Sequence, residues 1–380
     1  MSNKISVLPD DNTFQDLTSL QQLHLNKNHI IKLSSKIFNG LSNLKVLDVD
    51  RNYIEDIEMG AFSSLKRLET LSLAYNKIKS LPNKLFWETN SLDSLYLSRN
   101  KIKSICLPIF NSKNRLTNLM LYSNKIQEID AKCFQDLKHL KQLSLSNNRI
   151  SVVRPNSFFG LVQLESLDLS GNKLKHLAAR AFTGPRRLSE LLLSNNNLEG
   201  WDENTFMSLD NLENVRLENN KLKALSSNTF KNNPHIAFFD LSKNSIERIE
   251  NGTFSSLNRL EFLELSNNLI DALPERIFTF CKFLDIINLA GNKLQEVPNN
   301  VFANLTELYK LHLADNEIKS IDANAFSNSV RLRFLSLQNN QISNLSITDF
   351  EQYAELDFVN LAGNPLPTTV IEHFELKASQ

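Results

Sequence analysis

Apolar residues recur along the chain in one fixed pattern. From Leu20 to Leu366, each unit of 24 residues reads LxxLxLxxNx(I/L)xx(I/L)xxxxFxxLxx, as in the unit that starts at Leu44. The LxL segment alternates apolar and polar residues with a period of two, which predicts a short β-strand whose leucines point inward. One unit cannot bury its apolar side chains alone, so neighbouring units must stack and share a continuous core.

Phenylalanine and asparagine keep the phase of this repeat. Phe occurs sixteen times at a spacing of 24, from Phe14 to Phe374, which accounts for two-thirds of the 24 Phe in the chain. The residues outside each strand are bulkier than the strand itself, so we expect the stack to curve with its parallel sheet on the concave face. Asparagine keeps the same spacing at Asn28, Asn52, Asn76, Asn100, Asn124, Asn148, Asn172, Asn196, Asn220, Asn244, Asn268, Asn292, Asn316, Asn340 and Asn364.

These residues resemble the leucine-rich repeat superfamily, in its typical 24-residue class with Phe on the convex side. The resemblance implies an α/β solenoid, a horseshoe with one parallel β-sheet on the concave face and short helical, 3-10 or irregular segments on the convex face. It also implies that the fifteen asparagines form a structural ladder, because buried polar groups need hydrogen-bond partners. Toll-like and Slit-like receptor ectodomains and leucine-rich matrix proteins of this superfamily bind other macromolecules.

The phase of the repeat divides the chain into three segments. Residues 1–19 are expected to form a partial N-terminal repeat, and residues 20–366 fifteen repeats, of which the last is incomplete. Residues 367–380 form a C-terminal tail without the Cys-rich cap that extracellular members usually carry. Terminal repeats need polar outer faces for solubility. We therefore interpret the chain as a piece of a longer protein, with unusual caps as the alternative.

Charge and motifs argue against several classes of function. The 42 Lys and Arg balance the 42 Asp and Glu, and zero net charge argues against nucleic-acid binding and electrostatic membrane binding. No apolar run is long enough to span a bilayer, so no direct membrane insertion is expected. The first residues, MSNKISVLPDD, contain no apolar region of a signal peptide. GxGxxG, GxxxxGK(S/T), HExxH and CxxC are all missing, so the sequence predicts no catalytic residue, no cofactor and no metal site.

The three cysteines are too few for a disulfide scaffold. Cys106 and Cys133 fall in adjacent repeats but three positions out of register, which predicts poor geometry for a disulfide. Cys281 takes a leucine position of the core. We therefore interpret all three as free thiols that serve as small apolar residues.

Three asparagines, Asn251, Asn304 and Asn344, match the N-glycosylation sequon. Asparagine is so abundant in this chain that several sequons are expected by chance. All three lie outside the LxL segment, where a glycan would leave the concave face open.

The residue just before the second leucine of LxxLxL faces solvent on the concave side. It is mostly polar in the first nine repeats, but the last six carry Phe238, Phe262, Ile286, Lys310, Phe334 and Phe358, which we call the aromatic stripe. The neighbouring column carries charged residues, including Asp240 and Glu264. An apolar stripe beside a charged column resembles the core and rim of an interface, and we predict ligand binding there. The alternative is a stacked ladder that stiffens the sheet.

A second cluster lies in repeats three to five. Tyr75, Tyr96, Met120 and Tyr122 are expected on outward-facing strand positions, with random scatter as the alternative. Tyrosine is enriched at interaction hot spots because it supplies contact area with few rotatable bonds. The cluster is therefore a second candidate for ligand binding.

The sequence favours a non-enzymatic module that binds a protein ligand on its concave face, as a receptor-like or secreted ectodomain or a fragment of one. One alternative is a structural matrix or adhesion protein that self-associates as a homodimer, and another is an intracellular leucine-rich-repeat scaffold. Repeats of the Phe type usually occur outside the cell, so we expect an extracellular or cell-surface protein. The missing signal peptide and Cys-rich caps leave a cytoplasmic location as the alternative.

Overall fold

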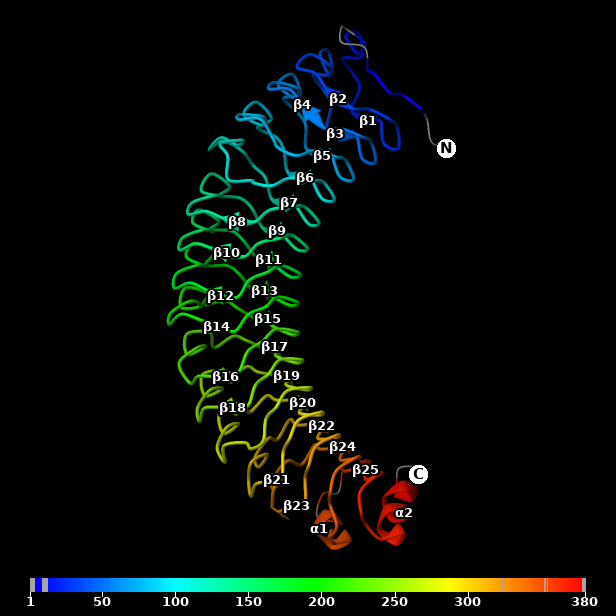
Figure 1. Cartoon of the computed structure of the whole chain (residues 1–380), viewed down its shortest axis with the longest axis vertical. Helices are drawn as coiled ribbons and strands as arrows, with labels where there is room; N and C mark the ends of the chain where they lie inside the picture. The colour runs from blue at the N-terminus through cyan, green and yellow to red at the C-terminus, as the bar shows by residue number, and fades with distance from the viewer. Residues whose placement is uncertain (1–3, 9–12, 323, 352, 354, 378–380) are drawn as a thin grey trace. The chain divides into compact units, whose positions relative to one another are not determined.

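The computed structural model describes residues 4–8, 13–322, 324–351, 353 and 355–377. The chain divides into two compact units, Met1–Leu191 (unit 1) and Leu192–Gln380 (unit 2). Each unit is a solenoid in which successive turns of chain stack at the repeat of the sequence (Figure 1). The expected solenoid is therefore confirmed in both units. Parts of the predicted terminal segments, at residues 1–3, 9–12 and 378–380, lie outside the described residues.

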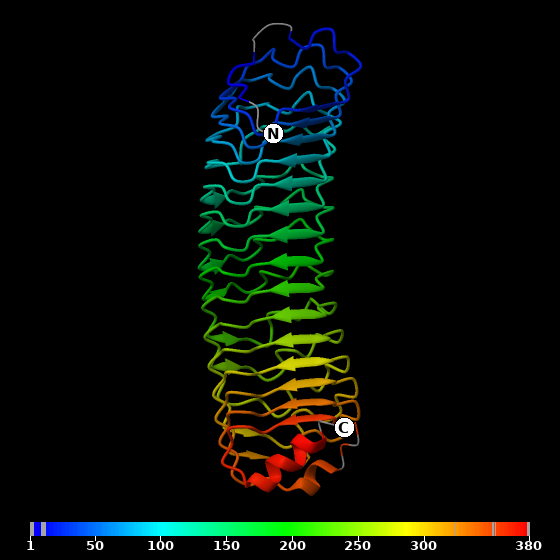
Figure 2. The ribbon, with the colours of Figure 1, turned by 90° about the vertical axis from the view of Figure 1, so that its right-hand side faces the viewer.

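In unit 1 the sheet consists of three-residue strands that pair in parallel. The register advances by one repeat at a time, so that Gln22 lies opposite Val46 and Leu23 opposite Leu47. The strands lie side by side, one for each turn of the chain (Figure 2). The middle residue of each strand is the second leucine of the repeat and faces the core, while its two neighbours face outward. The strands are β1 (Gln22–His24), β3 (Val46–Asp48), β5 (Thr70–Ser72), β6 (Ser94–Tyr96), β7 (Asn118–Met120), β9 (Gln142–Ser144) and β11 (Ser166–Asp168), and β13 (Glu190–Leu192) falls at the boundary between the units.

Unit 2 repeats the same arrangement. Phe238 lies opposite Phe262, and Phe334 opposite Phe358, in a parallel sheet on the concave side of the unit. The strands are β15 (Asn214–Arg216), β17 (Phe238–Asp240), β19 (Phe262–Glu264), β20 (Ile286–Asn288), β22 (Lys310–His312), β24 (Phe334–Ser336) and β25 (Phe358–Asn360).

The convex sides carry turns and two-residue strands rather than regular helices. A typical turn closes where the Leu65 amide donates to the Phe62 carbonyl at 3.0 Å. The sequence left helical, 3-10 and irregular segments open for the convex side. The structure has irregular turns there, and the helix α1 (Ile347–Glu351) is the exception among the described residues. The short strands are β2 (Lys32–Leu33), β4 (Asp56–Ile57), β8 (Glu128–Ile129), β10 (Val152–Val153) and β12 (His176–Leu177) in unit 1, and β14 (Gly200–Trp201), β16 (Ala224–Leu225), β18 (Arg248–Ile249), β21 (Glu296–Val297) and β23 (Ser320–Ile321) in unit 2.

The recurrent phenylalanines form a stacked spine inside the solenoid. The rings of Phe38 and Phe62 stack with centroids 6.0 Å apart, and those of Phe278 and Phe302 at 5.7 Å. All four of these side chains are buried among the leucines. Stacking at the repeat distance explains why one aromatic residue recurs at one phase, since in runs such as Phe38, Phe62 and Phe86 each ring packs on the next.

The asparagine ladder is present as expected. Asn76 donates from Nδ2 to the carbonyls of Leu73 and Val49, both at 3.1 Å, and its Oδ1 accepts the Ile54 amide at 3.0 Å. The side chain thus bridges its own turn and the preceding one, which satisfies backbone groups that no strand pairs. The other ladder asparagines are also buried, except Asn244, which is half-buried.

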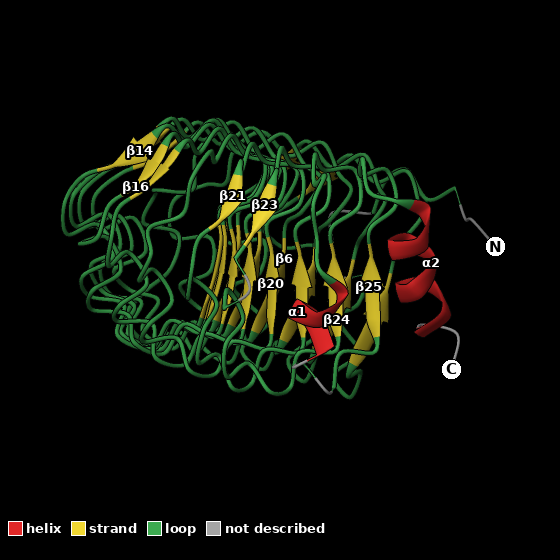
Figure 3. Cartoon of the chain, turned by 90° about the horizontal axis from the view of Figure 1, so that it is seen from below, coloured by secondary structure: helices red, strands yellow, loops and turns green. Residues whose placement is uncertain are grey.

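A helix covers the last strand of unit 2. The tail forms α2 (Thr368–Lys377), which lies beside β25 (Figure 3). Phe374 is buried and meets the Phe350 ring edge-on at 5.6 Å between centroids. Near the other terminus, the Ile5 amide donates to Oδ1 of Asn28 at 3.1 Å, so this segment takes the place of a preceding repeat.

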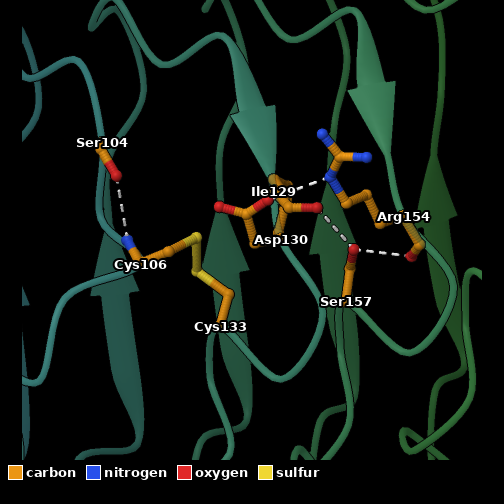
Figure 4. The surroundings of a disulfide bond; sticks show 7 residues. All are labelled: Ser104, Cys106, Ile129, Asp130, Cys133, Arg154 and Ser157. Carbon is orange, nitrogen blue, oxygen red and sulfur yellow. Dashed lines mark hydrogen bonds and ion pairs between the residues drawn. A yellow bond between two sulfur atoms is a disulfide. The ribbon is translucent and has the colours of Figure 1, made fainter.

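The prediction of three free thiols is wrong. Cys106 and Cys133 form a disulfide with their Cα atoms 4.6 Å apart (Figure 4). Cys281 is the one free cysteine and is buried. The expectation failed because residues 131–133 lie in a turn rather than in an extended segment. The Cys133 amide donates to the Asp130 carbonyl at 3.3 Å, which brings the Cys133 position back to the level of Cys106.

Candidate binding surfaces

The aromatic stripe lies on the outer surface of the sheet in unit 2. Its six residues are the first residues of consecutive strands from β17 to β25, and each side chain is half-buried. The Phe238 and Phe262 rings stack in parallel at 4.6 Å, and the Phe334 and Phe358 rings at 4.5 Å. Ile286 and Lys310 separate the two pairs. The stripe therefore consists of two stacked pairs that each keep apolar surface open to solvent.

The alternation of the strand explains this exposure. Phe239 follows Phe238 directly and is fully buried, because successive side chains of a strand point to opposite faces. The second residue of each strand is thus buried in the core, whereas core packing does not determine which residue stands first in the strand. Nothing in the repeat itself requires an aromatic residue at the first position, since unit 1 places residues such as Thr70 and Gln142 there.

Polar side chains flank both aromatic pairs. The Arg216 guanidinium lies over the Phe238 ring at 4.9 Å, and the His312 ring packs against Phe334 at 5.0 Å. Burial lowers the pKa of His312, an effect that Glu264 partly opposes and Lys310 strengthens. Burial therefore favours the neutral form of the imidazole that packs against Phe334.

The two acidic residues predicted beside the stripe are half-buried and hold turns of the chain. Asp240 accepts the Ser242 amide at 2.9 Å. Glu264 accepts the Ser266 amide and the Asn288 side-chain amide, both at 2.9 Å. Asp240 and Glu264 thus shape the rim of the stripe, and their predicted contact with a ligand stays a prediction.

The tyrosine cluster is not arranged as the sequence suggested. Tyr96 and Met120 lie side by side on β6 and β7. Tyr75 and Tyr122 do not lie on strands, because each strand is only three residues long and both tyrosines follow it. Tyr75 has a left-handed backbone, with a φ of 54°. The expectation of four outward strand positions is therefore wrong for two of the four residues.

Tyr75 instead joins a group of cations at the turn that follows the strand. Its ring lies between the guanidinium groups of Arg51, at 4.2 Å, and Arg99, at 5.1 Å. These two arginines occupy the same repeat position as Tyr75 in the preceding and following turns. The ring is therefore part of the turn edge rather than of the sheet face.

The two units carry opposite net charges, which the net charge of the whole sequence does not show. Unit 1 contains 27 Lys and Arg against 17 Asp and Glu, whereas unit 2 contains 15 against 25. The zero net charge of the chain therefore conceals two units of opposite sign. Counting the charges of each half separately would have found this feature from the sequence alone.

Asn251, Asn304 and Asn344 are exposed and lie outside the strands of the sheet, as expected. Their glycosylation stays a prediction. Within the described residues, no group of three or more His, Cys, Asp or Glu side chains is placed to hold a metal ion. None of the described helices has the length and apolar character needed to cross a membrane.

Several solved structures share this fold. An LRR protein of Leptospira interrogans is 26% identical, with a TM-score of 0.74, and the match covers 99% of this chain and 93% of that one. The plant peptide hormone receptor RGFR1, solved in complex with RGF2, is 24% identical with a TM-score of 0.67 over 92% of this chain, which spans 60% of the receptor chain. An internalin (inlF) of Listeria monocytogenes is 23% identical with a TM-score of 0.64, over 80% of this chain and 83% of that one.

No curated protein matches the sequence. The family described as leucine rich repeat matches residues 1–54, 42–102, 114–174, 164–222, 210–270 and 306–366. These matches cover well over half of the residues. The chain therefore belongs to the leucine rich repeat family.

Proposed function

We propose that this chain is a non-enzymatic protein-binding module that recognises a protein ligand on the sheet face of unit 2. The observation that carries the proposal is the two half-buried aromatic stacks on the sheet face, Phe238 with Phe262 and Phe334 with Phe358. Apolar side chains on an open face, with charged neighbours at the rim, match the composition of interface cores. The complex of the plant peptide hormone receptor RGFR1 with RGF2 supports a peptide or protein ligand for a module of this fold.

The shape of the surface fits a large partner better than a small molecule. Three-residue strands in a single layer expose a continuous open face, whereas small-molecule sites are enclosed clefts or cavities. The sequence also lacks the motifs of the common catalytic and nucleotide sites. Both observations favour binding over catalysis.

An extracellular or cell-surface location is part of the proposal. The Cys106–Cys133 disulfide supports it, because disulfides persist in oxidising compartments and are rare in the cytosol. The exposed sequon asparagines are compatible with passage through the secretory pathway. The disulfide argues against the alternative of an intracellular scaffold.

Self-association is the second candidate function. The opposite net charges of the two units favour it, because a positive unit of one copy attracts a negative unit of another. Light scattering at increasing salt separates the two candidates. Dimers that dissociate as salt rises would support a matrix or adhesion role, and a monomer at all salt concentrations would support ligand recognition.

Binding to an array of purified secreted and cell-surface proteins tests the leading proposal. The double variant Phe262→Ser, Phe334→Ser removes one ring from each stacked pair. A partner of the wild type should lose affinity for this variant by about 30-fold, or about 2 kcal/mol, as for a hot-spot pair.

The matched control is Gln142→Ser with Ser166→Ala, at the same repeat position of unit 1. This control should bind the same partner with unchanged affinity. A partner that loses affinity equally for both variants would show that the aromatic stripe is not the binding site.

A further inference from the structure

Unit 1 has a basic edge where each strand turns into the next segment. Three outward positions define the edge: the residue before the ladder asparagine, the residue after it and the third residue after it. In unit 1 these positions hold eleven Lys and Arg against a single acid, Glu55. In unit 2 the same positions hold five Lys and Arg against five Asp and Glu. The repeat itself therefore does not demand cations there.

The centre of this edge is a single column, formed by Lys77, Lys101, Lys125, Arg149 and Lys173, which we call the basic column. Each of these residues follows a ladder asparagine, and each side chain is half-buried or exposed.

Backbone hydrogen bonds hold the column in register. The Lys101 amide donates to the Ile78 carbonyl at 2.8 Å, and the Lys125 amide to the Ile102 carbonyl at 2.8 Å. The Arg149 and Lys173 amides bind the preceding turn in the same way, at 2.9 and 2.8 Å. The cations are therefore stacked at the spacing of the strands, about 4.8 Å from one turn to the next.

Most of these charges have no counter-charge in the protein. Lys77 lies 3.9 Å from Glu55, but Lys101, Lys125, Arg149 and Lys173 make no ion pair with any residue in the described ranges. Like charges at this spacing repel each other, so the column destabilises the isolated fold. A row of unpaired cations with fixed spacing is the electrostatic pattern that attracts a linear polyanion.

We infer that the basic column of unit 1 is a docking edge for a sulfated polysaccharide. A linear chain with a permanent charge on successive sugars can follow a row of cations from turn to turn. The Cys106–Cys133 disulfide lies in the same unit and indicates an oxidising compartment, where sulfated polysaccharides rather than nucleic acids are the linear polyanions encountered. A second copy of the chain fits less well, because unit 2 interleaves acids and bases at this edge instead of presenting an acidic column.

This edge is separate from the aromatic stripe, which lies in unit 2 and is proposed to bind protein. Loss of one binding activity therefore leaves the other measurable. The affinity of the protein for sulfated chains can therefore be measured without a protein ligand.

The test uses a size-defined heparin oligosaccharide, titrated calorimetrically into the whole chain at several salt concentrations. The variant changes Lys101, Lys125, Arg149 and Lys173 to Gln. We expect at least about a tenfold loss of affinity, with a salt slope that is shallower by about three to four, since each lost cation releases one fewer counterion. The melting temperature should stay equal or rise, because repulsion within the column is removed.

The control variant changes Lys113, Arg115, Lys138 and Arg187 to Gln, which removes as many exposed charges from the same unit outside the basic edge. The control should retain most of the affinity for heparin. An equal loss in both variants would show diffuse attraction to unit 1 and overturn the inference. Tighter binding of a single-stranded oligonucleotide than of heparin at equal salt, or equal binding of unsulfated hyaluronan, would overturn it as well. A lower melting temperature of the column variant would show that the column is structural.

Discussion

The Ser157 hydroxyl donates to the carbonyl of Ile129 in the preceding turn at 2.7 Å, and this contact explains the disulfide beside it. Cys133 occupies the repeat position of Ser157 one turn earlier, and Cys106 directly follows the residue that corresponds to Ile129 (Figure 4). Side chains at this position therefore point toward the preceding turn. A serine there bonds a carbonyl, and a cysteine meets another cysteine.

The disulfide predicts the count of thiols and part of the stability. Unfolded protein under non-reducing conditions should titrate one thiol, that of Cys281, and three after reduction. Cys106→Ser with Cys133→Ser should lower the free energy of unfolding by about 3 kcal/mol, because the cross-link limits the unfolded chain. Urea titration measures this loss, and the variant Cys281→Ala, which keeps the disulfide, should titrate no thiol without reduction.

The free thiol predicts a pH dependence. Burial raises the pKa of Cys281 from 9.0 to about 12. The unfolded chain then loses this proton at a lower pH than the folded one, so the stability that the neutral thiol contributes is present below pH 9 and is lost as pH rises above it. Wild type should lose about 1.4 kcal/mol per pH unit in this range relative to Cys281→Ala. Urea titrations of the two proteins below and above pH 9 measure this loss. If the free energy of unfolding depended on pH equally in both proteins, the thiol would not be desolvated in the fold.

The asparagine ladder predicts a contrast between buried and exposed residues. Asn268 donates to the Leu241 and Leu265 carbonyls at 3.0 Å and accepts the Ile246 amide at 3.0 Å. Asn268→Ala should therefore lower stability by about 1–3 kcal/mol, because buried backbone groups lose their partner. Lys221→Ala, at an exposed side chain, should change it by less than about 0.5 kcal/mol. Similar losses in denaturant titrations would contradict the ladder.

The periodic part of the fold could be predicted from the sequence because each repeat position has one environment. Leu47, Phe62 and Asn76 are buried where their phase placed them. Predictions failed where the path of the backbone within a repeat mattered. Three residues in a turn span less distance than three residues in a strand, so the repeat spacing placed Cys133 too far from Cys106. The strand was also expected to be longer than it is, which placed Tyr75 on the sheet instead of on the turn edge.

The candidate surfaces could be predicted only in part, because solvent-facing positions are not fixed by the core. The stripe was found from Phe262 and Phe334, whose repeat position is mostly polar in the first nine repeats. The basic column was missed because the averaging of charge over the whole chain cancelled Lys125 and Arg149 against the acids of unit 2. Surface function thus follows from comparison between repeats rather than from the repeat itself.

Left-handed turns predict opposite effects of one substitution at two sites. Lys243 is exposed and has a φ of 52°, a conformation that costs a residue with a Cβ roughly 1–2 kcal/mol. Lys243→Gly relieves this strain but also gives the unfolded chain more conformational freedom, which offsets part of the gain. The free energy of unfolding should therefore stay the same or rise by up to about 1 kcal/mol. Lys231→Gly, at an exposed turn residue without a positive φ, should lower it. Thermal unfolding measures both, and a loss of equal size at the two sites would show that the left-handed turn is not strained.

The last prediction concerns what the aromatic pairs contribute to the fold. The Phe334 and Phe358 rings stack at 4.5 Å, so their separate replacements by Ala should not be additive. A double-mutant cycle should give a coupling of about 0.5–1.5 kcal/mol in the free energy of unfolding. Phe262 and Phe358 lie several strands apart, and the cycle between them should give a coupling within about 0.5 kcal/mol of zero. A coupling near zero for the stacked pair would remove the stiffening role, and recognition of a ligand would then be the remaining physical reason for four phenylalanines on this face.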